Sequence, residues 1–316
     1  MKILVTGGCG YKGSVLIPKL LADGHNVVSV DTQWFGNSLR EHPNLANLKL
    51  EIRDSDTLPL DGVDAVIHLA NIANDPAVEL NPNLSWEVNV LAGQQLADRA
   101  ARAGVKQFIF ASSGSVYGVK EEPNVTEELN LVPISAYNKT KMVAERVFLS
   151  YADQMKVHCI RPATVCGLSP RMRLDVSVNM LTYQALKNGK ITVFGGEQTR
   201  PNIHIQDMAD IYRHFLAHRD LPSGCYNAGF ENLKIIDIAK RVQETTGAQI
   251  IISESNDPRS YRQDSSKLLA TGFKPSFCIQ NAIDEITAAY QSKSLTTNDS
   301  CYTVQWMKQI KLEQRN

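Results

Sequence analysis

The sequence predicts an α/β fold in which a doubly wound parallel sheet is joined to a smaller α/β lobe on its C-terminal side. Three observations support this prediction. Short β-branched runs alternate with longer amphipathic segments over the N-terminal half, a glycine-rich turn separates the first strand from the first helix, and the pattern changes after Gly167. Alternating strands and helices are typical of parallel sheets with right-handed crossovers.

Each predicted strand of the N-terminal half is a short apolar run. We expect strands at 2–5, 26–30, 65–69, 107–111 and 157–161. Apolar residues at helical spacing predict helices at 11–23, 86–103 and 136–151. Gly24 and Gly104 end the first two helices, and Ser135 is placed to cap the third.

The second half of the chain predicts a smaller lobe. Segment 168–175 is rich in arginine and is expected to be a loop. We expect helices at 176–187 and 235–246, and strands at 191–194 and 249–253. This lobe would cover the carboxyl edge of the sheet, where doubly wound folds bind their ligands.

The composition argues against several classes of protein. The 316 residues contain 33 Lys plus Arg and 33 Asp plus Glu, so no net charge favours binding to nucleic acid or to an acidic membrane. No apolar run is long enough for a signal peptide or a membrane span, and we therefore expect a cytoplasmic protein. The 6 cysteines include no C-x-x-C pair, so neither a disulfide framework nor a metal site is expected.

The first predicted strand runs into the turn GGCGYKG, which has glycine at positions 7, 10 and 13. Gly7 permits a tight turn, Gly10 lets the backbone approach a pyrophosphate, and Gly13 lets the helix pack closely on the sheet. The helix N-terminus offers N–H groups and a partial positive charge to the phosphates. The turn therefore predicts a Rossmann-type dinucleotide-binding fold.

The second strand leads to Asp31. A carboxylate at this position accepts hydrogen bonds from a ribose hydroxyl and repels a 2′-phosphate. Thr32 and Gln33 follow, and neither can hold a phosphate as an arginine would. The sequence therefore favours NAD over NADP.

A serine, a tyrosine and a lysine suggest acid–base chemistry. Ser113 follows the fourth predicted strand, and Tyr137 and Lys141 lie one helical turn apart on the same face. A phenol has an ordinary pKa near 10 and is a poor base at neutral pH. An ammonium one turn away stabilises the phenolate and lowers that pKa.

These motifs, taken in this order along the chain, resemble the extended short-chain dehydrogenase/reductases. Within that group they are most similar to the NAD-dependent epimerase/dehydratase family that acts on nucleotide sugars. The resemblance covers residues 2 to about 275.

The resemblance implies a role for each residue of the triad. Tyr137 would be the acid/base, and Lys141 would tune it and hold the nicotinamide ribose. Ser113, three residues before the sequence Val-Tyr-Gly, would hold the sugar hydroxyl, with Ser112 and Ser115 as rivals.

The same resemblance implies the residues that contact the two small molecules. The implied cofactor contacts are Gly7, Gly10, Tyr11, Lys12, Gly13, Asp31, Glu51, Ile52, Leu69, Ala70, Asn89, Ala111, Ser112, Tyr137, Lys141, Pro162, Thr164 and Val165. Asn89 would act by supporting the site. The implied substrate contacts are Asn74, Ser113, Ser115, Asn179, Phe194, Arg200 and Arg259.

We expect a chain divided into two functional parts and a tail. Residues 1–166 and about 200–229 would form the NAD-binding Rossmann domain, and about 167–199 and 230–291 the substrate-binding lobe. The tail, 292–316, is polar and charged and would either pack on the body or fray.

The expected function is an NAD-dependent nucleotide-sugar epimerase or dehydrogenase/ketoreductase that moves a hydride at a sugar carbon, C4 in most relatives. Relatives that are 4,6-dehydratases have Asp-Glu where this chain has Gly114 and Ser115, which disfavours dehydration. Ser115 also disfavours a decarboxylase, because glutamate is usual there. His204 is interpreted as a packing residue rather than a catalytic acid.

Two alternatives remain open at this stage. One is an NAD(P)-dependent reductase of a non-sugar ketone or alcohol, which would lack a grip for a pyrophosphate. The other is a non-catalytic protein that senses NAD.

The resemblance also implies a homodimer, in which the helices at 86–103 and 136–151 of each subunit form a four-helix bundle.

Overall fold

The computed structural model describes residues 1–254 and 260–310. Its strands are β1 (Lys2–Thr6), β2 (Asn26–Asp31), β3 (Leu45–Lys49), β4 (Ala65–His68), β5 (Gln107–Ala111), β6 (Lys156–Pro162), β7 (Thr164–Cys166), β8 (Lys190–Phe194), β9 (Thr199–His204), β10 (Gly224–Ala228), β11 (Glu231–Lys234) and β12 (Gln249–Ser253). Its α-helices are α1 (Gly13–Ala22), α2 (Asp75–Leu80), α3 (Pro82–Trp86), α4 (Gly93–Arg102), α5 (Ala136–Leu149), α6 (Ser177–Asn188), α7 (Ile205–Ala217), α8 (Ile235–Thr246), α9 (Ser266–Leu269), α10 (Ile279–Gln291) and α11 (Thr303–Gln309).

A seven-stranded parallel sheet forms the centre of the molecule, in the order β10-β6-β5-β4-β1-β2-β3. This confirms the predicted α/β class and the doubly wound sheet. The chain leaves β1 toward β2 and β3, then returns to β4 on the other side of β1. Ligands bind at such a reversal of strand order, outside the carboxyl ends of the strands.

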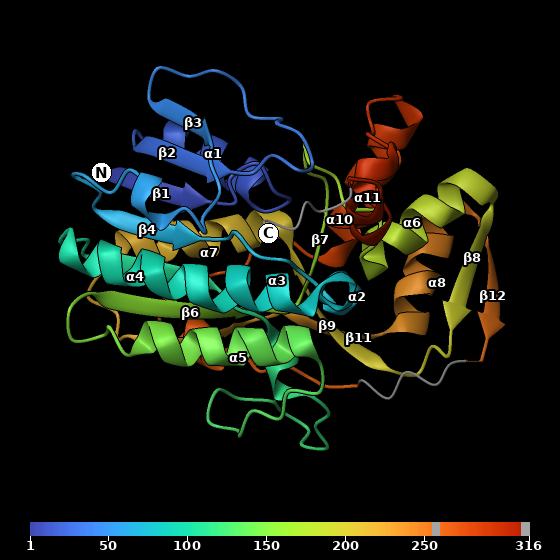
Figure 1. Cartoon of the computed structure of the whole chain (residues 1–316). Coiled ribbons are helices and arrows are strands. Elements are labelled where there is room, and N and C mark those ends of the chain that lie inside the picture. The colour runs from blue at the N-terminus through green and yellow to red at the C-terminus, as the bar shows by residue number, and fades with distance from the viewer. Residues whose placement is uncertain (255–259, 311–316) are drawn as a thin grey trace.

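Helices cover both faces of this sheet (Figure 1). On one face, α1 packs against α7, and Leu16 and Leu20 share a buried cluster with Ile211 and Phe215. On the other face, Leu96 of α4 and Phe148 of α5 belong to a second buried cluster. The five predicted strands of the sheet are present, each to within two residues of its expected ends.

The predicted helix at 86–103 is part of a longer helical run. Helix α3 continues into a π-helical segment, Glu87–Ala92, and then into α4. A π-helical segment widens one turn of a helix and is frequent near functional sites.

The smaller lobe contains two further sheets, β11-β9-β7 and β12-β8. Helices α6, α8 and α10 pack together beside them, around a buried cluster that includes Leu181, Ile238 and Ile283. Figure 1 shows this lobe beyond the ends of the central strands. Across the described residues, no helix is both long enough and apolar enough to cross a membrane.

Candidate active site

A cavity of about 620 Å³ lies at the carboxyl ends of the central strands, facing the smaller lobe. It brings together most of the predicted site residues. Those implied as cofactor contacts that line it are Gly7, Gly10, Tyr11, Lys12, Gly13, Asp31, Glu51, Ile52, Leu69, Ala70, Ser112, Tyr137, Pro162, Thr164 and Val165. Those implied as substrate contacts that line it are Asn74, Ser113, Ser115 and Arg200.

The glycine-rich turn is packed too closely for side chains at two of its positions. Gly7 has a φ of +74°, and a Cβ there would lie 2.6 Å from the backbone nitrogen of Ala70. A Cβ on Gly13 would lie 2.5 Å from the carbonyl oxygen of Gly8. Helix α1 begins here, and its N-cap, Lys12, makes no side-chain capping bond. The N-terminal end of α1, with its partial positive charge, therefore lies at the cavity wall.

Asp31 is held at the far end of this turn. Its carboxylate accepts hydrogen bonds from the backbone N–H of Cys9 at 3.0 Å and of Gln33 at 2.6 Å. Burial raises the pKa of the carboxyl above its ordinary value, and these two bonds act against the rise. A carboxylate fixed in this way at the cavity wall can accept hydrogen bonds from vicinal hydroxyl groups.

Tyr137 lies in the first turn of α5, which Ser135 caps as predicted through a 3.1 Å bond from the N–H of Asn138. The Ser113 hydroxyl lies close enough to the phenol to act on its pKa. Ser113 lies 2.7 Å from the Ser115 hydroxyl, which donates to the Asn138 side chain at 2.6 Å. Ser113, Ser115 and Asn138 therefore form a hydrogen-bonded row beside Tyr137 along the cavity wall.

The protonation of Tyr137 reflects opposing influences. Burial raises the pKa of the phenol to about 12, and the nearby Asp75 carboxylate adds to the rise. The Ser113 hydroxyl and the positive charge of Arg173 partly offset this rise. An additional positive charge brought into the cavity would bring the pKa of the Tyr137 phenol down from this raised value.

Lys141 lies behind Tyr137 and is not among the described residues that line the cavity, so its contact with the nicotinamide ribose stays a prediction. Its ammonium donates to the carbonyl of Ala111 at 2.6 Å and lies 5.8 Å from the centre of the Tyr137 ring. Burial holds the pKa of Lys141 well below its usual value, and the charge of Lys12 adds to the effect. Ala111, whose carbonyl is occupied by this bond, is also outside the lining.

Asn89 and Ser112 support the site from behind. The Asn89 amide is fully buried and bonds both backbone groups of Ile72 and the Thr140 hydroxyl, contacts that suit the supporting role expected for it. Ser112 reaches the cavity, but its hydroxyl donates to Glu145 at 2.5 Å. That bond leaves Ser113 as the serine whose hydroxyl acts on the Tyr137 phenol.

Asn179 has a structural role, and the prediction of substrate contact is corrected. Its side chain is fully buried, accepts from Gly167 N–H at 2.9 Å and donates to the Arg173 carbonyl at 2.8 Å and to Tyr11 at 3.0 Å. It therefore ties the glycine-rich turn to the loop that leaves β7. Phe194 is 57% exposed on β8 and is absent from the described lining.

Arg259, the remaining predicted substrate contact, lies outside the described residues.

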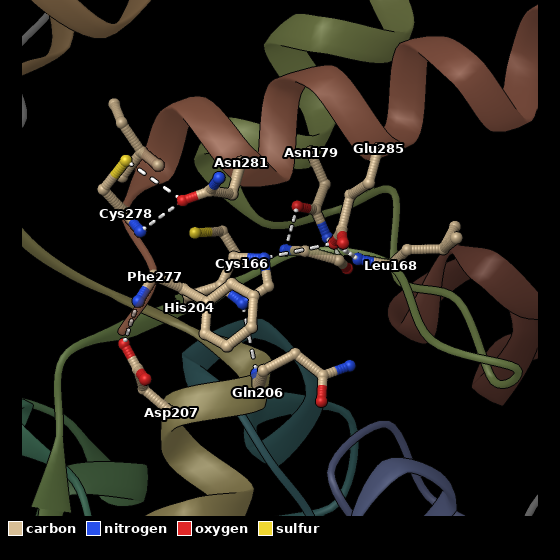
Figure 2. A network of polar contacts seen from close by, with 12 residues as sticks. Cys166, Leu168, Asn179, His204, Gln206, Asp207, Phe277, Cys278, Asn281 and Glu285 are labelled. Carbon is tan, nitrogen blue, oxygen red and sulfur yellow. Dashed lines mark hydrogen bonds and ion pairs between the residues drawn. The ribbon is translucent and has the colours of Figure 1, made fainter. Parts of the chain in front are cut away.

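His204 is a buried packing residue, in agreement with the interpretation from sequence. Its Nδ1 caps α7, its Nε2 lies 3.2 Å from Glu285, and its ring stacks on Phe277 (Figure 2).

Two arginines of the loop after β7 were missing from the predicted site. Arg171 and Arg173 both line the cavity. Arg173 pairs with Asp175 at 2.8 Å, and Arg171 stacks 4.0 Å from the centre of the Phe35 ring. The signal was present in the sequence, because an Arg-x-Arg pair stands in a loop expected at the ligand-binding edge of the sheet.

These arginines form a positively charged region with Lys12. Burial lowers the pKa of Lys12 to about 8, and the charge of Arg173 contributes. Burial and Arg173 also lower the pKa of Arg171 to about 10. Cations held close together in a buried cavity indicate a site for an anionic ligand such as a diphosphate.

A model of the NAD dependent epimerase/dehydratase family matches residues 3–229. The chain belongs to this family. Its relatives include the UDP-glucose 4-epimerase of Lactobacillus helveticus, which is 29% identical over 323 aligned positions that cover 92% of this chain and 96% of that protein.

Solved structures of the family have the same fold. The UDP-glucuronic acid 4-epimerase of Bacillus cereus, in complex with UDP-glucuronic acid and NAD, is 26% identical, with a TM-score of 0.79 over 92% of this chain and 100% of that one. TunA, an NAD dependent-NDP-hexosamine 5,6-dehydratase, is also 26% identical, with a TM-score of 0.82 over 92% and 98% of the two chains.

NAD is therefore the cofactor of this enzyme, and the residues present fit it. The crowded turn at Gly7 and Gly13 leaves room for backbone alone, the start of α1 faces the cavity, and Asp31 is fixed at the position that accepts ribose hydroxyls. The chain is a member of the epimerase/dehydratase family, and its relatives are nucleotide-sugar enzymes that include both epimerases and dehydratases.

Proposed function

We propose that this chain is an NAD-dependent epimerase of a nucleoside-diphosphate sugar that acts at C4. The observation that carries the proposal is the position of the Ser113 hydroxyl beside the Tyr137 phenol, in a cavity that Lys12, Arg171 and Arg173 also line. The first pair provides an acid/base beside a hydroxyl. The three cations provide positive charge for the diphosphates of NAD and of the sugar substrate.

Tyr137 is proposed to take the proton from the sugar hydroxyl and later to return it. Ser113 would donate a hydrogen bond to the same sugar oxygen and so align it with the phenol. The positive charge of Lys141, held behind the ring by the Ala111 carbonyl, would favour the phenolate over the phenol. General acid–base groups of this kind contribute about 10²–10⁴-fold to a rate.

The bound cofactor would be held by the glycine-rich turn, the start of α1 and Asp31. When bound, NAD would be the oxidant: it would accept a hydride from a sugar carbon and could return it. An enclosed site that keeps both the cofactor and the oxidised sugar favours return over release, and hence an epimerase over a net dehydrogenase or ketoreductase.

Dehydration is disfavoured by the side chains beside Tyr137. Elimination of water needs an acid and a base in addition to the tyrosine. Positions 114 and 115 offer a glycine and a serine, and the Ser115 hydroxyl is engaged by Ser113 and Asn138. Arg171 and Arg173 line the cavity in addition to Lys12, which is expected beside the diphosphate of NAD. This additional positive charge argues against a non-sugar ketone as substrate, because such a molecule has no diphosphate to bind.

We further propose that the protein is a cytoplasmic homodimer. The helical run at 82–102 and α5 pack side by side, and Leu91 on that run is 58% exposed. An exposed leucine on a helix pair is available to a second copy of the chain. Light scattering should give the mass of two chains, and a monomer would overturn this part of the proposal.

The experiment is a product analysis with a set of nucleotide sugars. UDP-glucose, UDP-galactose, UDP-glucuronic acid and UDP-N-acetylglucosamine are each incubated with the protein, and the sugars are resolved by nuclear magnetic resonance. We expect the C4 epimer of at least one of them, and none with Tyr137→Phe. A 4-keto-6-deoxy product would instead identify a dehydratase.

A further inference from the structure

The C-terminal segment 299–310 lies across the end of the cavity that contains Asp31. It comprises a 3-10 turn, Asp299–Cys301, followed by α11, which Figure 1 shows in red between the central sheet and the smaller lobe. The indole N–H of Trp306 donates to the backbone carbonyl of Trp34 at 2.6 Å. Trp34 stands three residues after Asp31, so this bond fixes α11 to the loop at the adenosine end.

The same segment is attached to the arginine loop on the other side. The carbonyl of Cys301 accepts from Leu174 N–H at 2.9 Å, and the N–H of Thr303 donates to the Asp175 carboxylate at 3.0 Å. Asp175 is also the partner of Arg173. The segment therefore spans the cavity and is fixed at both edges.

Residues of α11 form part of the cavity wall. Thr303, Val304 and Met307 line the same space as Asp31 and Ile52. Met307 is 4% exposed and shares an apolar cluster with Ile52. A ligand whose ribose bonds Asp31 would thus have α11 beside its base.

We infer that segment 299–310 is a strap that closes over the adenosine half of NAD and slows its release. The inference rests on NAD as the cofactor and not on the reaction proposed above. Helix α11 has only 7 residues, and a helix of that length is unstable in water without packing partners. Opening the strap therefore requires loss of its contacts with Trp34 and Asp175, and this loss sets the barrier to release.

The test measures how fast the loaded protein loses NAD. Protein incubated with NAD is desalted rapidly, and the NAD that stays bound is measured over time after denaturation. We expect a chain that ends at Asn298 to lose NAD at least about tenfold faster, a change of about 1.4 kcal/mol. Trp306→Phe replaces the indole by a phenyl ring, which keeps an aromatic side chain but removes the N–H donor to Trp34. This variant should lose NAD about fivefold faster.

Lys308→Ala is the matched control, because Lys308 is exposed on the same helix. It should release NAD at the unmodified rate. Thermal unfolding of the NAD-free proteins identifies variants that have lost their fold, and Trp306→Phe keeps the test decisive if the shortened chain does not fold. The inference is overturned if the folded variants retain NAD as long as the full chain.

Amide hydrogen exchange gives an independent readout. Addition of NAD should slow the exchange of residues 303–309, and unchanged exchange there would contradict the strap. Absence of epimerisation with every nucleotide sugar would overturn the proposed function and leave this result unaffected.

Discussion

The carboxylate of Glu145 and the guanidinium of Arg161 form a two-point ion pair, with N–O distances of 2.9 and 2.8 Å. Their side chains are 1% and 5% exposed. Ser112 donates to the same carboxylate, and Arg161 also donates to the Tyr117 hydroxyl at 2.7 Å. This buried network lies directly beneath the strand end that carries Ser113, so it fixes the floor of the active site.

We expect Glu145→Gln to destabilise the fold strongly, because it leaves the Arg161 charge buried without its counter-ion. The free energy of unfolding, measured in urea, should fall by about 3–5 kcal/mol. The matched control is Asp98→Asn, which breaks the pair with Arg102 at the surface, where the Arg102 side chain is 78% exposed. That change should cost no more than about 1 kcal/mol, and equal costs at the two sites would contradict the assignment.

The hydrogen-bonded row beside Tyr137 predicts unequal roles for two serines. Ser113→Ala removes the hydroxyl beside the phenol that is proposed to align the sugar oxygen, and it should lower kcat about 100-fold, with NAD still bound. Ser115→Ala should lower kcat only a few-fold, because its hydroxyl bonds Ser113 and Asn138 rather than the phenol. Steady-state kinetics on the best nucleotide sugar decides between them, and a larger loss for Ser115→Ala would reverse the roles.

The lowered pKa of Lys12 predicts that NAD binding takes up protons in mildly alkaline solution. Its pKa is about 8 without a ligand, and a diphosphate beside it raises that value, since an opposite charge favours the ammonium. Above pH 8 the free protein is partly deprotonated there, so binding adds a proton and weakens as the pH rises. Titration calorimetry at pH 8.5 in two buffers measures the uptake.

Lys12→Met serves as the comparison for that measurement. It should bind NAD more weakly at pH 7 and take up no proton at pH 8.5. Proton uptake equal to that of the unmodified protein would place the titrating group elsewhere.

His68 predicts that the fold loses stability in acid. Burial lowers the pKa of its imidazole to about 3, whereas an unfolded chain titrates near 6.5. Between these values the unfolded chain binds one more proton, so the free energy of unfolding falls by up to about 1.4 kcal/mol per pH unit as the pH drops below 6.5.

The measurement is urea denaturation between pH 7 and pH 4.5. His68→Phe should give a shallower pH dependence, because it removes the imidazole that titrates in the unfolded chain. A phenyl ring can pack at this position against the rings of Phe108, Phe110 and Phe148. His42→Gln, at an exposed position, is the control. The same slope in all three proteins would show that His68 is not the source.

The sequence was sufficient to predict the central sheet because its strands are buried on both faces. Such strands are continuous apolar runs that are easy to recognise. The glycine-rich turn is also recognisable, because only glycine fits at positions 7 and 13. The two edge strands, β3 and β10, were missed. The residues of β3 are largely half-exposed or exposed and carry little periodic signal, and β10 contains Gly224 and Asn227, which are not typical of strands. The resemblance to the family placed Tyr137 and Ser113 at the cavity wall, which the geometry bears out.

The parts that escaped prediction depend on contacts between distant segments. As far as residue 310, the tail packs on the body because Trp306 bonds Trp34 and Thr303 bonds Asp175. Nothing local in a polar segment indicates such partners. Asn179 was assigned to the substrate from the resemblance to the family, although an amide can bond either a ligand or the backbone. Only the fold shows that its bonds are taken by Gly167 and Tyr11.

The central claim is that Tyr137 serves a C4 epimerisation in which NAD is restored within the same site. The most direct test uses a nucleotide sugar carrying deuterium at C4, incubated with the protein and no added cofactor. We expect the deuterium to be retained at C4 in both epimers, because the hydrogen removed is the one returned. Loss of the deuterium with accumulation of NADH and a keto sugar would contradict the claim and identify a dehydrogenase.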